Sequence, residues 1–176
     1  MSMNETIYGI WNTTVGGNSF SLTPGLSFGN YPSSESPAMA FDGNITTKYT
    51  TFGFCTVNSN TINCGINTGF YFTPKRGSSF IVSLQFYTAN DFSSRDPMTV
   101  TLEGSNSANS SLIYGSSWTL IYNGPSGLGI DPGRYGAGQI QNFSNTVRYT
   151  SYRLLVTSIR SASNAVQYSE VRLQAY

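Results

Sequence analysis

Short runs in which aromatic and β-branched residues alternate with polar ones constrain this chain more than any other feature. Gly, Asn, Ser and Pro, which favour turns, separate these runs. Alternation with a period of two is typical of a β-strand that buries one face. In residues 79–86 one predicted face carries Phe80, Val82, Leu84 and Phe86, and the other carries Ser79, Ile81, Ser83 and Gln85. The chain is therefore predicted to be all-β.

Four further runs alternate in the same way, and each can supply one wall of a β-sandwich. The side chains predicted to share an inward face are Met98, Val100 and Leu102; Trp118, Leu120 and Tyr122; Tyr152, Leu154 and Val156; and Val171, Leu173 and Ala175. In the last run, the outward face is predicted to carry Glu170, Arg172 and Gln174.

Helical signals are few. One turn of helix is expected over residues 36–41, because Ser36 can cap it and Pro37 suits the first helical position. The Gly-rich stretch 124–138 is expected to form a surface loop.

The length of 176 residues suits one all-β domain and leaves little room for a second. We expect residues 1–176 to form one domain, with residues 1–6 as a loose N-terminal segment. Hydrophobic residues make up 39% of the chain and charged residues only 10%. Ser, Thr, Asn and Gly occupy the remaining surface, a composition typical of extracellular β proteins.

The net charge of +1 and the scattered Lys and Arg residues give no basic stripe, so nucleic acid is not an expected partner. No apolar stretch approaches the roughly 20 residues that span a bilayer. The start, MSMNETIYG, lacks the apolar core of a signal peptide. We expect either a chain whose signal has been removed or one module with neighbouring domains in a longer chain.

Two cysteines, Cys55 and Cys64, enclose a polar segment of turn composition, and a disulfide that closes this loop is predicted. The alternative is two unrelated buried thiols. A disulfide favours a secreted or cell-surface protein. N-glycosylation sequons point weakly the same way, at Asn4, Asn12, Asn44, Asn109 and Asn142.

The sequence contains no histidine, which removes the usual general base, the Ser-His-Asp arrangement and most zinc sites. Among pairs of carboxylates that could cleave a glycoside, Asp91 and Asp96 are the nearest to each other in sequence. They share a short loop with Arg95, which favours a salt-bridged loop instead. We therefore expect a protein that is not an enzyme.

Three segments resemble discoidin, or coagulation-factor type C, domains. The first is SPAMAFDGNITTKYTTF at residues 36–52, in which an Ala-rich turn runs into Asp-Gly, polar residues, Thr and an aromatic. The central pair LQFYTANDFSSRDPMTVTLEGSNS and SSWTLIYNG, and the closing YTSYRLLVTSIRSASNAVQYSEVRLQAY, are similar as well. The resemblance covers about residues 20–176. It implies an antiparallel β-sandwich or jelly roll, galactose-binding-domain-like, with ligand-binding loops at one end.

The resemblance also implies a structural calcium ion beneath those loops. Asp42 and Glu170 match the carboxylate ligands and Thr47 matches a hydroxyl ligand, and such hard oxygen donors suit Ca²⁺. The matching main-chain carbonyls are those of Met39, Asn44 and Ser169. The alternative is that Asp42 merely caps a tight Asp-Gly turn.

Sugar recognition in carbohydrate-binding relatives uses an Arg or Asn of the central loop, an aromatic face and often a histidine, which this chain lacks. The matching loop offers Asn90, Asp91, Arg95 and Asp96, although Arg95 and its Asp neighbours could merely hold the loop. The candidate stacking aromatics are Tyr31, Phe52, Phe54 and Phe92. Tyr49, where the family has Trp, is expected in the core.

A neutral chain with aromatic loops and many amide groups suits a polar, uncharged ligand, so a glycan-binding module is the leading hypothesis. The alternative is an adhesion or membrane-surface module that binds phospholipid or a receptor, although Lys48, Lys75 and Arg76 are few for that role. A third hypothesis is a structural module beside a catalytic domain.

Overall fold

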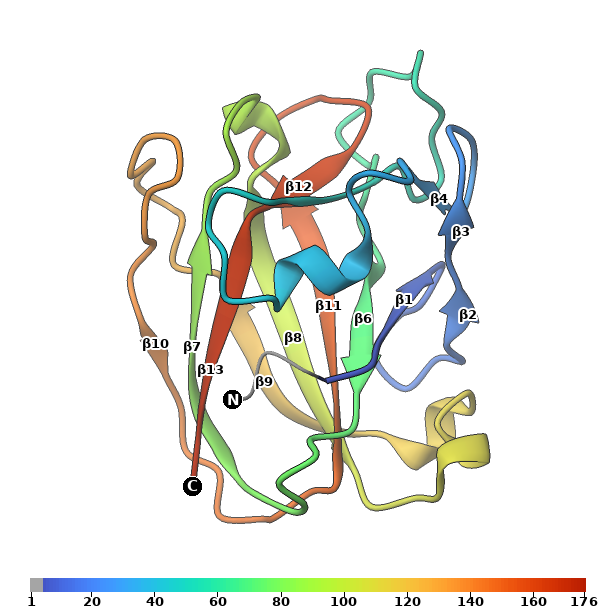
Figure 1. Ribbon diagram of the computed structural model, residues 1–176, viewed down its shortest axis with the longest axis vertical. Coiled ribbons are helices and arrows are strands. Elements are labelled where there is room, and N and C mark those ends of the chain that lie inside the picture. Colours follow the sequence, from blue (N-terminus) through green and yellow to red (C-terminus); the bar gives the residue numbers. More distant parts are fainter. Residues whose placement is uncertain (1–4) are drawn as a thin grey trace.

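The computed structural model describes residues 5–176 and shows a β-sandwich without α-helices in this range (Figure 1). One sheet has six strands in the order β2-β1-β6-β11-β8-β9, and the facing layer contains β10-β7-β13 and the pair β12-β5. The strands of the first sheet are β1 (Ile7–Trp11), β2 (Phe20–Ser21), β6 (Thr68–Phe72), β8 (Pro97–Ser105), β9 (Thr119–Pro125) and β11 (Ser151–Ile159). The other strands are β3 (Thr23–Pro24), β4 (Asn30–Tyr31), β5 (Tyr49–Thr51), β7 (Ile81–Tyr87), β10 (Gln141–Asn142), β12 (Val166–Tyr168) and β13 (Glu170–Ala175). All pairs except β3 with β4 are antiparallel, so the predicted fold class is confirmed.

The core lies between the two layers. Alternate residues of β11 and β13 point into it, and Tyr152, Leu154 and Val156 are fully buried as predicted. Val171 and Leu173 are buried against them from the facing layer. Other core residues include Tyr49, Phe70, Phe72, Leu84, Phe86, Val100, Leu102 and Tyr168. The expected core position of Tyr49 is confirmed.

A β-bulge in β7 corrects one predicted strand face. Gln174 pairs with Ser83 and Ala175 with Ile81, so Val82 is an extra residue without a partner on β13. The bulge reverses the alternation, so that Ile81 is fully buried while Val82 is only half-buried. The predicted common face is therefore correct at Leu84 and Phe86 but wrong before them.

A second bulge, in β9, corrects another face. Leu102 pairs with Tyr122 and Glu103 with Leu120, which leaves Ile121 as the extra residue. Leu120 is consequently exposed, although the sequence pattern predicted it to be inward. Trp118 is buried on the outer face of the sheet, where its ring lies 5.9 Å from that of Tyr71.

Part of the outer face of the six-stranded sheet is also buried, under residues 16–19 and the segment 106–118. Glu103 of β8 and Arg153 of β11 are both fully buried there. Leu112 of this cover is buried as well, and its carbonyl oxygen accepts a hydrogen bond from Trp118 Nε1 at 3.0 Å. The cover contains the short 3-10 turns η3 (Asn109–Ser111) and η4 (Gly115–Ser117). This sheet is therefore buried on its inner face and, around Glu103 and Arg153, on its outer face as well.

The expected helical turn is the 3-10 turn η1 (Pro37–Ala40). Ser36 is its N-cap residue and Pro37 begins it, as predicted, but the Ser36 side chain makes no capping bond. The Gly-rich stretch is a loop after Pro125, as predicted, except that Leu128 reaches the core. The predicted disulfide between Cys55 and Cys64 is present. Residues 1–4 of the expected loose segment lie outside the described range, within which no helix is long and apolar enough to cross a membrane.

Candidate functional site

Three loops lie at the upper end of the sandwich in Figure 1: residues 88–96, 129–136 and 160–165. The loop 41–48 runs up toward them from η1, and its Lys48 contacts Asp91. The loop 88–96 contains the short turn η2 (Ser93–Arg95). Backbone bonds join it to the loop 129–136, since the N–H of Tyr135 donates to the carbonyl of Ala89 at 3.2 Å. These loops contain the predicted ligand residues Asn90, Asp91 and Arg95.

Asp91 is held by neighbouring side chains. Its Oδ1 accepts hydrogen bonds from Lys48 Nζ at 2.8 Å and from Gln167 Nε2 at 2.7 Å. Lys48 also lies 3.7 Å from Glu35. Partial burial acts to raise the pKa of Asp91, but the bonds from Lys48 and Gln167 outweigh it and lower that pKa. Asp91 is therefore an ionised acceptor that fixes the positions of Lys48 and Gln167.

Arg95 mainly holds the loops together. Its guanidinium donates to Asn164 at 2.7 Å, to Gln167 at 3.0 Å and to Ser163 at 3.3 Å. It also lies over the ring of Phe92, 4.1 Å from the centroid. Phe92 has a left-handed backbone, with φ of 41°, and is 57% exposed. The loop therefore presents the Phe92 ring to solvent while it uses Arg95 for support.

Asp96 is not available to a ligand, which corrects its prediction as a binding residue. Its side chain is fully buried and accepts two bonds from Arg134, at 3.0 and 2.8 Å. Arg160 lies 3.3 Å from the same carboxylate. Because two charged partners compensate for its burial, Asp96 anchors the 129–136 loop from below.

The predicted loop aromatics divide into exposed and buried rings. Phe52 is buried, which corrects its prediction as a stacking residue. Tyr31 is half-buried and packs against the core. Phe54 is exposed, and its ring lies 5.4 Å from that of Trp11. Phe92 is the exposed predicted ring on the loop that contains Asn90 and Asp91.

A hollow of about 270 Å³ lies between these loops. Its lining combines polar groups and one ring: Ser34, Glu35, Met39, Thr46, Thr47, Lys48, Asn90 and Tyr135. Tyr135 is 42% exposed and has a left-handed backbone with φ of 58°, which is uncommon outside glycine. We did not predict Tyr135 from sequence, although its position between Gly133 and Gly136 in a polar loop was a usable signal.

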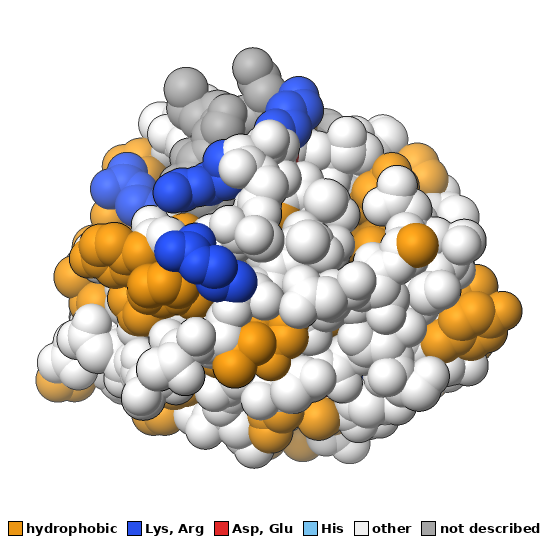
Figure 2. All heavy atoms as spheres, turned by 90° about the horizontal axis from the view of Figure 1, so that it is seen from below, with side chains coloured by type: hydrophobic (Ala, Val, Ile, Leu, Met, Phe, Trp, Pro, Cys, Tyr) orange, Lys and Arg blue, Asp and Glu red, His pale blue; other side chains and the backbone are white. Residues whose placement is uncertain are grey.

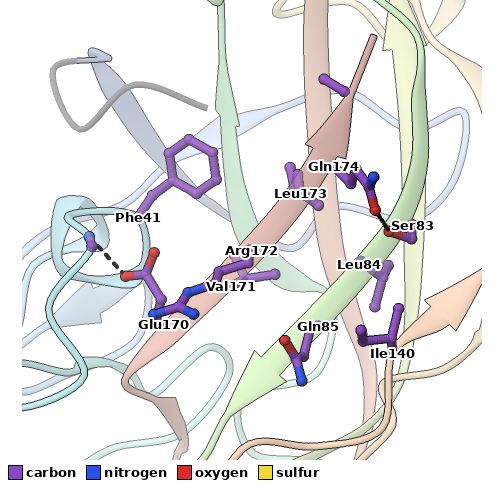
Figure 3. Close-up of a pocket in the computed structure, with 12 residues that line it drawn as sticks. Phe41, Ser83, Leu84, Gln85, Ile140, Glu170, Val171, Arg172, Leu173 and Gln174 are labelled. Atoms are coloured by element: carbon purple, nitrogen blue, oxygen red, sulfur yellow. Dashed lines mark hydrogen bonds between the residues drawn. The ribbon is translucent and has the colours of Figure 1, made fainter.

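The predicted calcium carboxylates come together beside this hollow. Asp42 accepts bonds from the hydroxyl of Thr47 and the N–H of Asn44, both at 2.8 Å. The Oε2 of Glu170 accepts from the N–H of Gly43 at 3.1 Å, as Figure 3 shows. Burial, and then the charge of Asp42, raise the pKa of Glu170 to about 7.

The remaining predicted calcium ligands surround the same loop. Met39 lies in η1, just before the loop of Asp42. Ser169 is fully buried next to Glu170, and its hydroxyl donates to the carbonyl of Thr88 at 2.9 Å. In the described residues no cluster of three or more His, Cys, Asp or Glu occurs. A cation here would therefore take its charge compensation from Asp42 and Glu170 alone.

A larger hollow, of about 450 Å³, runs along the outer face of β7 and β13 from Glu170 (Figure 3). Cross-strand pairs line it, Arg172 with Gln85 and Gln174 with Ser83. Phe41, the aromatic residue of its lining, is buried in the core. This hollow offers amides and one guanidinium but lacks the exposed ring that the loop hollow has.

The sequence matches no protein-family model and none of the curated proteins. Solved structures do match. One is a family 32 carbohydrate-binding module of a Clostridium perfringens family 31 glycoside hydrolase, with 11% identity, a TM-score of 0.59, and coverage of 83% of this chain and 86% of that one.

Two further matches are modules of the same family and organism. The module of NanJ, in complex with galactose, has 10% identity, a TM-score of 0.54, and coverage of 81% and 87% of the two chains. A module bound to GalNAc-β-1,3-galactose has 13% identity, a TM-score of 0.52, and coverage of 97% and 94%. At such identities the likeness shows the fold, a discoidin-like, galactose-binding-like β-sandwich.

Proposed function

We propose that this chain is a non-catalytic glycan-binding module that holds a sugar in the hollow between its end loops. The observation that carries the proposal is the placement of the exposed Tyr135 ring beside Asn90, Lys48 and Glu35. An aromatic face packs against the apolar side of a sugar ring, while amide, ammonium and carboxylate groups bond its hydroxyls. All of these group types line this one hollow.

The shared fold supports a galactose-type ligand, since two modules with this fold were solved with galactose and with GalNAc-β-1,3-galactose. The disulfide supports an extracellular or cell-surface location for such a module.

The state of the acidic loop residues supports a binding function rather than hydrolysis. A glycosidase needs one carboxyl group that can donate a proton near neutral pH. Here Asp91 has a lowered pKa through Lys48 and Gln167, and Asp96 is locked to Arg134 and Arg160. The Asp91–Asp96 pair, which the sequence offered for glycoside cleavage, is therefore engaged by cationic partners and supports the loops.

Tyr135→Ala is expected to weaken glycan binding about tenfold or more, because it removes the aromatic face while the polar groups remain. A glycan array first identifies the ligand, and titration calorimetry then compares wild type with the variant. Tyr114→Ala is the matched control, since Tyr114 is an exposed tyrosine in the segment that covers the far sheet. Equal affinity of wild type and Tyr135→Ala would exclude this hollow as the site.

We also propose that calcium binds beneath these loops through the side chains of Asp42, Thr47 and Glu170. The residues fit this ion, because Asp42, Thr47 and Glu170 supply hard oxygen donors with two formal negative charges. In addition, Glu170 is buried, and no cationic side chain among the described residues lies at salt-bridge distance from it. The ion would neutralise both carboxylates and tie the 41–48 loop to β13. Met39, Asn44 and Ser169 would contribute carbonyl oxygens.

Chelation of calcium is expected to lower the melting temperature by about 5–10 °C. An ion that binds only the folded state stabilises it by about 2.7 kcal/mol at a hundredfold excess over Kd, which corresponds to such a shift at this size. Asp42→Ala and Glu170→Ala should each abolish the response in scanning calorimetry, whereas Asp91→Ala should retain it. A wild-type protein with the same melting temperature in calcium and in chelator would contradict the site.

One observation favours the alternative of a membrane-surface module. Two neighbouring loops carry five exposed apolar side chains: Leu26, Phe28, Phe54, Val57 and Ile62. The N–H of Val57 donates to the carbonyl of Leu26 at 3.3 Å, which joins the loops, and residues 12–34 and 49–74 contain no charged residue. Sedimentation with phosphatidylcholine or phosphatidylserine vesicles tests this alternative. It would be favoured if the wild-type protein sediments, Phe28→Ser does not, and the glycan array shows no binding.

A further inference from the structure

A second aromatic hollow lies at the other end of the sandwich, where β1 begins and β6 ends. Tyr8 and Tyr71 are opposite each other in these strands, and their rings are stacked with centroids 4.9 Å apart at an angle of 16°. Tyr8 is 51% exposed, while Tyr71 is half-buried. The stack is therefore a fixed ring surface with one face open to solvent.

Polar groups surround this ring surface. The hollow has a volume of about 320 Å³, and its lining is Thr6, Tyr8, Tyr71, Thr73, Lys75, Asn109 and Leu112. Among residues 5–176, no hydrogen bond uses the hydroxyls of Tyr8 and Tyr71, the amide of Asn109 or the ammonium of Lys75. A concave site with free polar groups around an exposed ring has the composition of a small-ligand pocket.

The charge of this end is positive, and Figure 2 shows Lys and Arg side chains gathered on it. Lys75, Arg76 and Arg148 are exposed here, and none of them belongs to a salt bridge between described residues. The nearby acid is Glu5, whose Oε2 accepts the N–H of Lys75 at 2.8 Å. Residues 1–4 contain no Asp or Glu. Arg148 also donates to the carbonyl oxygens of Ser78 at 3.5 Å and Tyr176 at 3.3 Å. Among the described residues, Lys and Arg side chains thus outnumber acidic side chains at this end.

We propose that this hollow is a second saccharide site, selective for a sugar that carries an acidic group. The pyranose ring would lie on Tyr8, hydroxyls would bond Asn109 and Thr6, and the carboxylate or sulfate would pair with Lys75. Arg76 and Arg148 would add attraction at longer range, because exposed charges act over about 8–10 Å at moderate salt. At the loop hollow, by contrast, the Lys48 ammonium is already paired with Asp91.

The experiment uses the whole chain produced without N-glycosylation, because Asn109 lies in a sequon. Three probes are titrated by calorimetry and by amide shifts in NMR spectra: lactose as the neutral sugar, 3′-sialyllactose for carboxylate and a heparin-derived hexasaccharide for sulfate. The variants are Tyr8→Ala, Tyr8→Phe and Lys75→Gln. The controls are Tyr114→Ala, an exposed ring outside the hollow, and Arg172→Gln, an exposed cation on the facing layer.

We expect at least one acidic probe to bind with shifts at Tyr8, Tyr71 and Lys75, and more weakly as salt is raised. Tyr8→Ala and Lys75→Gln should each reduce this affinity about fivefold or more, Tyr8→Phe should retain it, and both controls should match wild type. Binding of 3′-sialyllactose would identify a carboxylate as the preferred acidic group, and binding of the hexasaccharide would identify a sulfate.

Four results would overturn the proposal. The first is that neither acidic probe binds, and the second is that lactose binds this hollow as tightly as the acidic probes. The third is that the affinity depends on salt but is the same in Tyr8→Ala as in wild type. The fourth is that Tyr135→Ala loses binding of the acidic probe. Tyr135→Ala also separates the two sites, because it should weaken binding at the loop hollow and leave this site intact. Failure of the first site therefore leaves the second testable.

Discussion

Arg153→Met is expected to lower the free energy of unfolding by about 3–5 kcal/mol, the largest effect of any single substitution proposed. Arg153 and Glu103 are both fully buried and share two bonds, at 2.7 and 2.9 Å. Arg153 also donates to the hydroxyl of Ser19 at 2.9 Å and to the carbonyl of Gly17 at 2.8 Å. The substitution would leave Glu103 buried without a cationic partner. Urea denaturation measures the loss.

Two variants make this prediction specific. Adding Glu103→Leu to Arg153→Met should recover much of the loss, because an apolar pair replaces the ion pair without an orphaned charge. Arg172→Met, at an exposed arginine, should change stability by less than about 0.5 kcal/mol. A loss below about 1 kcal/mol in Arg153→Met would show that the outer face hydrates readily and that the 106–118 cover is loose.

Asp96→Asn is expected to lower stability by about 2–3 kcal/mol and also to weaken glycan binding. It removes the carboxylate that compensates Arg134 and Arg160, and the loss stays below that of a fully enclosed pair because both arginines are partly exposed. Arg134 directly precedes Tyr135, so releasing it frees the ring that we assign to the sugar. Denaturation and calorimetry together measure both effects.

Asp131→Asn is the matched control for Asp96→Asn. Asp131 contacts the same Arg134 at 2.8 Å but is exposed, so its replacement should change stability only slightly. A destabilised Asp96→Asn protein with undiminished glycan affinity would show that the loop keeps its position without this anchor, and would separate the two roles.

The sequence pattern predicted the strands well and their faces less well. Periodicity identifies β11 and β13 because each pairs regularly at its inward residues. The bulges at Val82 and Ile121 depend on the pairing with the neighbouring strand, so the residue pattern of one strand alone does not predict them. Hydropathy likewise placed Trp118 in the sandwich core, whereas the 106–118 cover created a second buried face that strand alternation cannot predict.

The sequence indicated which loop contributes to the candidate site, but not which of its side chains face a ligand and which hold the loop in place. The sequence pointed to the central loop through its Asn, Asp and Arg residues, and the structure places Asn90 of this loop in the lining of the hollow. Whether each points out or in depended on distant partners: Asp96 turns inward because Arg134 and Arg160 come from other loops. Tyr135 was missed although its Gly-rich neighbours indicated an exposed loop, because its place beside Asn90 follows from the anchoring of Arg134 on Asp96.

The Gly-rich stretch is fastened at both of its ends. Leu128 is buried in the core at one end, and Arg134 is fixed on Asp96 at the other. Most of the conformational entropy of the segment that carries Tyr135 is therefore lost when the protein folds, before any sugar arrives. Between the two anchors, residues 129–133 are exposed, so substitutions of side chains there other than Asp131, which contacts Arg134, can accumulate between descendants of this chain with little effect on the ring.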